Sequence, residues 1–167
     1  MLLGLSACGP SPEQADTLGR YLMESLVYAR ETADTLMMED LFLPDATYDD
    51  YPSQLQYQGI QDIVGFLTSV HEWGDDVYLT LGNVRAGPST AVGEWYLAAV
   101  QSRPIPSVIE SGTGRDVSIN GITLLEIEGG RIARAADYWD NASFLLQLGG
   151  RVELPDGTVL TGPETPN

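Results

Sequence analysis

Two segments of the sequence carry side chains with the types and spacing that acid/base chemistry requires. The first is the alternating stretch Ala135-Ala136-Asp137-Tyr138-Trp139. In a β-strand, Asp137 shares one face with Ala135 and Trp139. A carboxyl group on an apolar face is poorly solvated, which favours its neutral form and suits it to proton transfer near neutrality. We therefore predict that Asp137 is a general acid or base. A structural carboxylate, hydrogen-bonded to the backbone or to an arginine, is the alternative interpretation.

The second segment is Tyr48-Asp49-Asp50-Tyr51-Pro52, where Tyr48 and Asp50 share one face of a short strand predicted over residues 46–51. If this face meets Asp137, the carboxyl groups of Asp50 and Asp137 can share one proton, with one group neutral and the other ionised. Tyr48, Asp50 and Asp137 are thus the candidate catalytic residues. For Tyr48 the alternative is amphipathic packing.

The aromatic residues are candidates for the wall of a ligand pocket. Trp73, Trp95 and Trp139 offer rigid apolar surfaces, and Ala135 lies on the same predicted face as Trp139. Packing in an ordinary core explains these residues equally well. His71, the single histidine, falls at the end of a predicted helix, where its favourable interaction with the helix dipole indicates a structural role.

The composition excludes several classes of function. The 167 residues have a net charge of -16, and all eight basic residues are arginines. Such an acidic surface repels phosphate backbones, so we expect no nucleic-acid partner. The absence of lysine excludes Schiff-base chemistry. One histidine and one cysteine cannot form a histidine-rich metal site or a disulfide framework, and we expect neither a metal nor a cofactor.

The order of the predicted elements indicates an α+β domain. Apolar residues at helical spacing predict three helices, over residues 12–29, 31–41 and 60–70. The strand at 46–51 precedes the third helix, and a longer loop is predicted at 102–114, at a sheet edge or cavity mouth. Alternation and β-branched residues predict four further strands, over residues 76–84, 90–101, 115–128 and 131–139. We expect a cone-shaped, curved, mostly antiparallel sheet wrapped around three N-terminal helices and enclosing a pocket.

The two ends of the chain are predicted to lie outside this domain, which we place at residues 13–150. Residues 151–167 form a C-terminal tail that can contain a hairpin. Residues 1–12 are interpreted as a lipoprotein-like signal remnant and tether, because Leu5-Ser6-Ala7-Cys8 resembles the lipobox of bacterial lipoproteins. The short apolar run before Cys8 contains no basic residue, so either the gene starts upstream or the match is coincidental. The first alternative predicts a lipid-anchored, extracytoplasmic protein attached to a bacterial membrane through Cys8; the second leaves a cytoplasmic protein.

Five short motifs, in order, resemble those of SnoaL-like polyketide cyclases in the nuclear-transport-factor-2-like superfamily. They are Glu39 to Tyr48, Tyr57-Gln58-Gly59-Ile60, Thr113-Gly114-Arg115, Glu128-Gly129-Gly130-Arg131-Ile132, and Tyr138-Trp139-Asp140 with Gln147-Leu148-Gly149. The resemblance covers roughly residues 13 to 150 and implies the curved-sheet fold and cofactor-free chemistry. It also implies that Asp137 acts as the general acid/base of an aldol closure. Sheet-face dimers are common in this superfamily, so a homodimer is expected.

Limonene epoxide hydrolase, a member of the same superfamily, offers a second comparison. The segment Tyr48 to Pro52 is similar to the part of that enzyme which holds the nucleophilic water. That enzyme also needs an arginine and an aspartate on the long middle strand, where this sequence has Trp95 and Leu97. The epoxide-hydrolase triad is therefore incomplete, and Trp95 and Leu97 become candidate pocket residues.

These observations predict cofactor-free acid/base catalysis, of the cyclase, isomerase or hydrolase type, on a small hydrophobic molecule. The alternative is a non-catalytic small-ligand-binding or interaction domain of an exported lipoprotein. The superfamily hosts both enzymes and binding proteins, so the fold alone does not choose between them.

Overall fold

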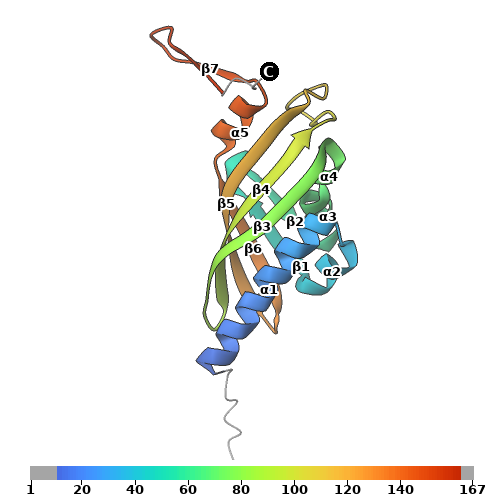
Figure 1. Ribbon diagram of the computed structural model, residues 1–167. Helices are drawn as coiled ribbons and strands as arrows, with labels where there is room; N and C mark the ends of the chain where they lie inside the picture. Colours follow the sequence, from blue (N-terminus) through green and yellow to red (C-terminus); the bar gives the residue numbers. More distant parts are fainter. Residues whose placement is uncertain (1–10, 163–167) are drawn as a thin grey trace, which may run out of the picture.

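A computed structural model of the 167-residue chain describes residues 11–162 (Figure 1). Cys8, the candidate lipidation site, lies outside the described residues. The elements, in chain order, are α1 (Pro12–Thr32), α2 (Thr35–Leu41), β1 (Phe42–Asp50), η1 (Tyr51–Ser53), β2 (Leu55–Gln58), α3 (Ile60–Thr68), α4 (Val70–Trp73), β3 (Gly74–Ala86), β4 (Thr90–Gln101), β5 (Arg115–Glu128), β6 (Arg131–Trp139), α5 (Asn141–Gln147), β7 (Arg151–Glu153) and β8 (Val159–Thr161).

One six-stranded sheet has the order β2-β1-β6-β5-β4-β3. All neighbouring strands are antiparallel except β1 and β6, which run parallel. Helix α1 lies across the sheet and packs on β3, β4 and β5, while α2, α3 and α4 gather beside it (Figure 1). The predicted α+β fold, with N-terminal helices packed against a mostly antiparallel sheet, is confirmed.

Capping residues determine where helix α1 begins and ends. Ser11 caps the first turn in a capping box with Gln14, and Ala33 ends the helix in the left-handed conformation with φ 53°. Leu22 and Leu26, one turn apart, are buried in the main hydrophobic core. Arg30 continues the same stripe by one more turn, so this charged residue also points toward the sheet.

Several predicted boundaries differ from the structure. Glu31 belongs to α1 and not to the second helix, because the chain turns only at Ala33. β1 begins before Pro44, which lies in the stretch where the register between β1 and β6 shifts, a place where the missing N–H of proline is tolerated. β2 was not predicted as a strand; its backbone pairs with β1 in antiparallel register.

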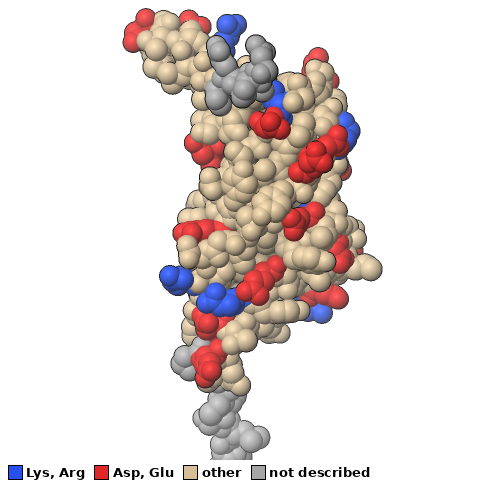
Figure 2. All heavy atoms as spheres, in the orientation of Figure 1, with Lys and Arg blue, Asp and Glu red and all other residues tan. Residues whose placement is uncertain are grey.

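Two further features of the molecule are its acidic surface and the hairpin near its C-terminal end. Acidic side chains are scattered over the face drawn in Figure 2, with few arginines between them. β7 and β8 form an antiparallel hairpin at the end of the molecule opposite the start of α1 (Figure 1). Within residues 11–162, no helix is both long enough and apolar enough to span a membrane.

Candidate functional site

A pocket of about 720 Å³ opens beside the six-stranded sheet. All three tryptophans of the chain, Trp73, Trp95 and Trp139, line it together with Leu97 and the phenylalanines Phe66 and Phe144. Its volume falls in the range of small-molecule sites, which are usually apolar with a few polar groups that orient the ligand. Among the described residues that line the pocket, Arg30 and Asp50 are charged and buried, whereas Glu72 is charged and exposed.

Asp137 lies beneath this pocket, fixed by two neighbours. Strand alternation on β6 turns its side chain inward, where only 1% of it is exposed. Arg30 Nη1 lies 3.3 Å from Asp137 Oδ2, and the Thr123 hydroxyl donates a hydrogen bond to the other carboxylate oxygen. Asp137 is not among the residues that line the pocket. Arg30, the ion-pair partner of Asp137, does line it.

Arg30 is the group that connects Asp137 with the pocket. Its guanidinium lies over the Trp95 ring, 5.4 Å from the ring centre, in a cation–π contact. The Trp95 indole in turn donates a hydrogen bond of 2.8 Å to the Thr123 hydroxyl. Arg30, Trp95, Thr123 and Asp137 thus form one connected buried network. Arginine remains charged under all ordinary conditions, so this network presents a permanent hydrogen-bond donor to the pocket.

Asp50 supplies a buried carboxyl group to the lining of the pocket. It pairs in register with Asp137 across β1 and β6, and 3% of it is exposed. Its Oδ1 accepts a hydrogen bond of 2.9 Å from the Trp139 indole. Burial raises the pKa of Asp50 above the ordinary value of an aspartate, and the charge of Asp137 adds to this shift. A carboxyl group in this state can exchange a proton with a bound molecule at a higher pH than a solvated one.

Tyr48, the third candidate catalytic residue, lies deeper than Asp50. Its ring is fully buried and contacts Phe66 edge-on, with ring centres 5.1 Å apart. Its hydroxyl finds no hydrogen-bond partner within residues 11–162. Burial raises the pKa of Tyr48 well above its ordinary value, so the phenol stays neutral. Tyr48, like Asp137, does not line the pocket, and Ala135 is buried in the main core.

Sequence reasoning missed two residues that build the site. For Arg30 one signal is present in the sequence. This charged residue continues the stripe of buried residues that contains Leu22 and Leu26 on α1. Gly121 lies in register between Trp95 on β4 and Trp139 on β6. A Cβ atom at Gly121 would lie 2.2 Å from the Trp95 ring, so only glycine leaves room for that indole. Gly121 falls inside the strand predicted over residues 115–128, but nothing in the local sequence indicates that a tryptophan ring packs against it.

The comparison with protein families identifies the domain. A family model described as the SnoaL-like domain matches residues 23–135, more than half of the chain. The chain belongs to the SnoaL-like domain family. No curated protein matches this SnoaL-like protein in sequence. Within the described residues, no three histidine, cysteine, aspartate or glutamate side chains form a group that could hold a metal ion.

Several solved structures share the fold of this SnoaL-like protein. TsrD from Streptomyces laurentii is 22% identical with a TM-score of 0.70, over 80% of this chain and 96% of that one. A protein named as a SnoaL-like polyketide cyclase from Jannaschia sp. CCS1 is 16% identical with a TM-score of 0.74, over 84% and 97%. An LEH-like epoxide hydrolase of M. tuberculosis is 15% identical with a TM-score of 0.63, over 80% and 90%. At these identities the similarity shows the fold alone.

Proposed function

We propose that the protein catalyses a cofactor-free proton transfer on a small, mostly apolar molecule that carries an oxygen function. Asp50 is the proton-transferring group. Arg30, held by Asp137, is the donor that stabilises charge developing on the oxygen of the substrate. The observation that carries this proposal is that Asp50 and Arg30, both buried, line the same aromatic pocket.

The charge balance of the pocket narrows the substrate class. Asp137 neutralises Arg30 at 3.3 Å, so the pocket floor has no excess positive charge to attract an anion. Asp50 in its neutral form adds no charge, and in its ionised form it repels anions. The aromatic walls favour an apolar body. An uncharged ketone, ester or epoxide with an apolar body fits these three features of the pocket.

The role predicted for Asp137 from the sequence differs from this assignment. As a general acid or base, Asp137 would have to reach the substrate itself, whereas its carboxylate contacts Arg30 and Thr123. We assign it the positioning of Arg30, with the reacting proton on Asp50. The rival proposal, a non-catalytic ligand-binding domain, uses the same pocket without proton transfer.

A panel of epoxides, enolisable esters and polyketide-like methyl esters tests the proposal. We expect turnover of at least one compound, and a loss of about a hundredfold to ten-thousandfold in kcat for Asp50→Asn. Asp49→Asn is the matched control, because Asp49 is the adjacent residue and pairs with Arg134 on the opposite face of β1. An Asp50→Asn protein that keeps full activity would refute the assignment. Binding of neutral apolar molecules without any turnover would favour the rival.

We also propose that the protein is attached to a bacterial membrane through a lipid on Cys8, as the lipobox-like segment Leu5-Ser6-Ala7-Cys8 indicates. Expression in a bacterial host of the gene with its upstream region should place the protein in the membrane fraction. A Cys8→Ala variant should then move to the soluble fraction. Identical fractionation of the two proteins would reduce the segment to coincidence.

A further inference from the structure

The loop between β4 and β5 forms part of the pocket wall. It runs over residues 102–114, and its tip residues Ile105, Pro106, Ser107 and Val108 line the pocket. Val108, near the tip, is 48% exposed. Two residues at the base of this loop, Arg103 and Gln101, make an unusual number of hydrogen bonds.

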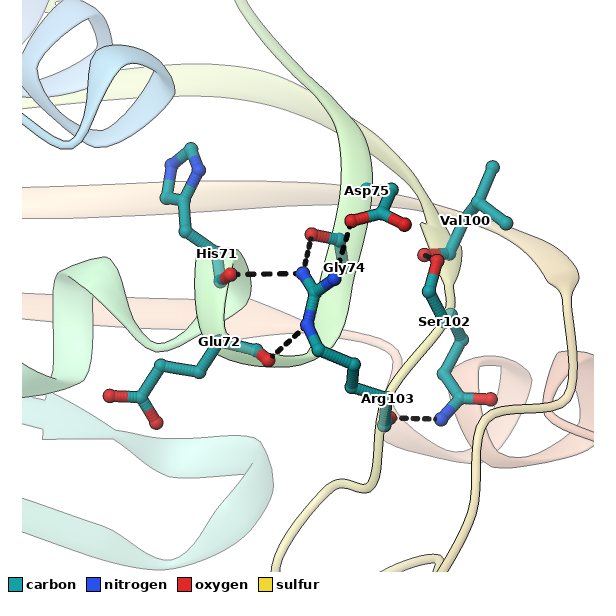
Figure 3. Close-up of polar contacts among 8 residues, drawn as sticks. His71, Glu72, Gly74, Asp75, Val100, Ser102 and Arg103 are labelled. Atoms are coloured by element: carbon teal, nitrogen blue, oxygen red, sulfur yellow. Dashed lines mark hydrogen bonds and ion pairs between the residues drawn. The ribbon is translucent and has the colours of Figure 1, made fainter.

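Arg103 fixes the loop to the end of helix α4 (Figure 3). Its guanidinium donates hydrogen bonds to the backbone carbonyls of His71, Glu72 and Gly74, at 3.1, 2.7 and 2.6 Å. It also pairs with Asp75 at 2.6 Å. The carbonyls in the last turn of a helix lack partners within the helix, so one arginine satisfies several of them at once.

Backbone contacts of the same segment hold Trp73, which also lines the pocket. The carbonyl of Trp73 accepts hydrogen bonds from the backbone N–H groups of Ser102 and Arg103, both at 3.0 Å. Trp73 lines the pocket and packs with Phe144 and Ile105 in one apolar cluster. Arg103 therefore connects two walls of the pocket, the loop tip and Trp73.

Gln101 fixes the base of the loop through hydrogen bonds of its buried side chain. It is fully buried, and its side-chain amide donates to the carbonyls of Arg103 and Ser111, at 2.5 and 3.2 Å. Its side-chain oxygen accepts hydrogen bonds from the backbone and the hydroxyl of Thr113, at 2.7 and 2.6 Å. One glutamine thus joins both ends of the loop. A buried amide with all of its partners satisfied specifies a single geometry.

Backbone hydrogen bonds also hold the tip of the loop in one conformation. Ile105 and Ile109 exchange backbone hydrogen bonds of 2.9 and 3.0 Å, and Ser107 between them has φ 63° in the left-handed region. The whole loop is therefore a fixed part of the pocket wall, in contrast to a flexible cover.

We infer that this loop sets the length of the molecule that the pocket accepts, and that Arg103 is the positioning residue that holds it in place. The inference rests on the proposed function, because it takes the pocket as the ligand site. A fixed wall produces a sharp length limit, since one methylene group too many must displace the wall. Val108 at the tip is then the residue that determines this limit.

The three tryptophans in the pocket provide the measurement. A homologous series of n-alkan-1-ols is uncharged, apolar and ends in an oxygen, which matches the proposed substrate class. Binding is followed by quenching of tryptophan fluorescence and by displacement of the neutral dye N-phenyl-1-naphthylamine. In the unmodified protein, affinity should rise about fourfold for each added methylene and then stop rising at one chain length.

Arg103→Ala should remove this limit, so that affinity continues to rise with longer alcohols. Val108→Phe, which leaves the base of the loop intact, should move the limit to shorter alcohols. Arg20→Ala is the control, because Arg20 makes only an exposed ion pair with Asp16 on α1, among the described residues. Hydrogen exchange of the peptide containing residues 102–114 should be slow in the unmodified protein and at least tenfold faster in Arg103→Ala.

The outcomes separate the two proposals. If the unmodified protein binds none of the alcohols and no dye, the ligand pocket is refuted and the length limit with it. If it binds them, but Arg103→Ala and Val108→Phe keep the original limit, only the inference about the loop is overturned. Rapid hydrogen exchange of the loop in the unmodified protein would overturn it as well.

Discussion

Arg30 and Asp137 lie 107 positions apart in the chain, yet their side chains form a buried ion pair of 3.3 Å beneath the pocket. Helix α1 supplies the arginine and strand β6 the aspartate. The Arg30 guanidinium also lies over the ring of Trp95, on strand β4. A helix and a strand far apart in the sequence thus meet in this ion pair.

The first prediction concerns the pH dependence of stability through Asp50. Burial raises the pKa of Asp50, so the folded protein holds this proton more tightly than the unfolded chain. Below the ordinary aspartate range of about 4, both states are protonated and Asp50 contributes nothing. As the pH rises from there through the raised pKa, the unfolded chain ionises first, and the free energy of unfolding decreases.

Asp50→Asn cannot ionise and keeps an oxygen that can accept the hydrogen bond from Trp139. The unmodified protein should therefore lose stability relative to this variant as the pH rises above about 4, and the two should converge in acid. Urea denaturation at a series of pH values measures the difference. A difference independent of pH, or one that grows in acid, would contradict the raised pKa.

The second prediction concerns the ion pair. Arg30→Met leaves the Asp137 carboxylate buried without its charged partner and should cost about 3 to 5 kcal/mol of stability. Asp137→Asn alone should also destabilise the protein, because it leaves Arg30 buried and unpaired. The double variant should recover most of the loss. A double-mutant cycle from urea denaturation measures the coupling, and additive losses would show that the two charges do not stabilise one another.

The third prediction concerns the Tyr48 hydroxyl. Because it finds no hydrogen-bond partner in the described part of the chain, Tyr48→Phe removes a buried polar atom whose desolvation is uncompensated. The variant should be as stable as the unmodified protein, or more stable by about 1 kcal/mol. Thermal denaturation tests this expectation. A clear loss of stability would mean that the hydroxyl is hydrogen-bonded, and a hundredfold loss of turnover would support the catalytic role predicted from the sequence.

The fourth prediction concerns Gly121. An alanine there would bring its Cβ to 2.2 Å from the Trp95 ring, so the indole must move and release Thr123. Gly121→Ala should cost about 1 to 3 kcal/mol and change the tryptophan emission spectrum. Gly65→Ala is the control, because a Cβ at Gly65 in α3 meets no atom within 4 Å. That variant should be more stable by about 0.5 to 1 kcal/mol, since alanine favours a helix. Equal effects of the two substitutions would contradict the crowding at Trp95.

Much of the site's strand geometry is determined by the sequence itself. Side chains alternate along a strand with a period of two residues, so the sequence alone predicts that Asp137 and Trp139 share a face, as do Tyr48 and Asp50. In the structure Asp137, Tyr48 and Asp50 are all buried, and Asp49 and Tyr138, their neighbours in sequence, face the other way. Strand pairing then decides which segments meet, as it does for β2, which the sequence did not predict.

Only the tertiary structure decides which of these carboxyl groups reaches the pocket. The depth of Asp137 and Asp50 depends on where helix α1 crosses the sheet, because Arg30 on that helix covers Asp137 and leaves Asp50 in contact with the pocket. Likewise, the contacts of Arg103 depend on the end of α4 meeting the start of the loop after β4. Such contacts arise between residues distant in sequence, and a local pattern of apolar and polar residues contains no information about the partner. The alternation of a strand is a property of the backbone, whereas the partner of a buried charge is a property of the packing.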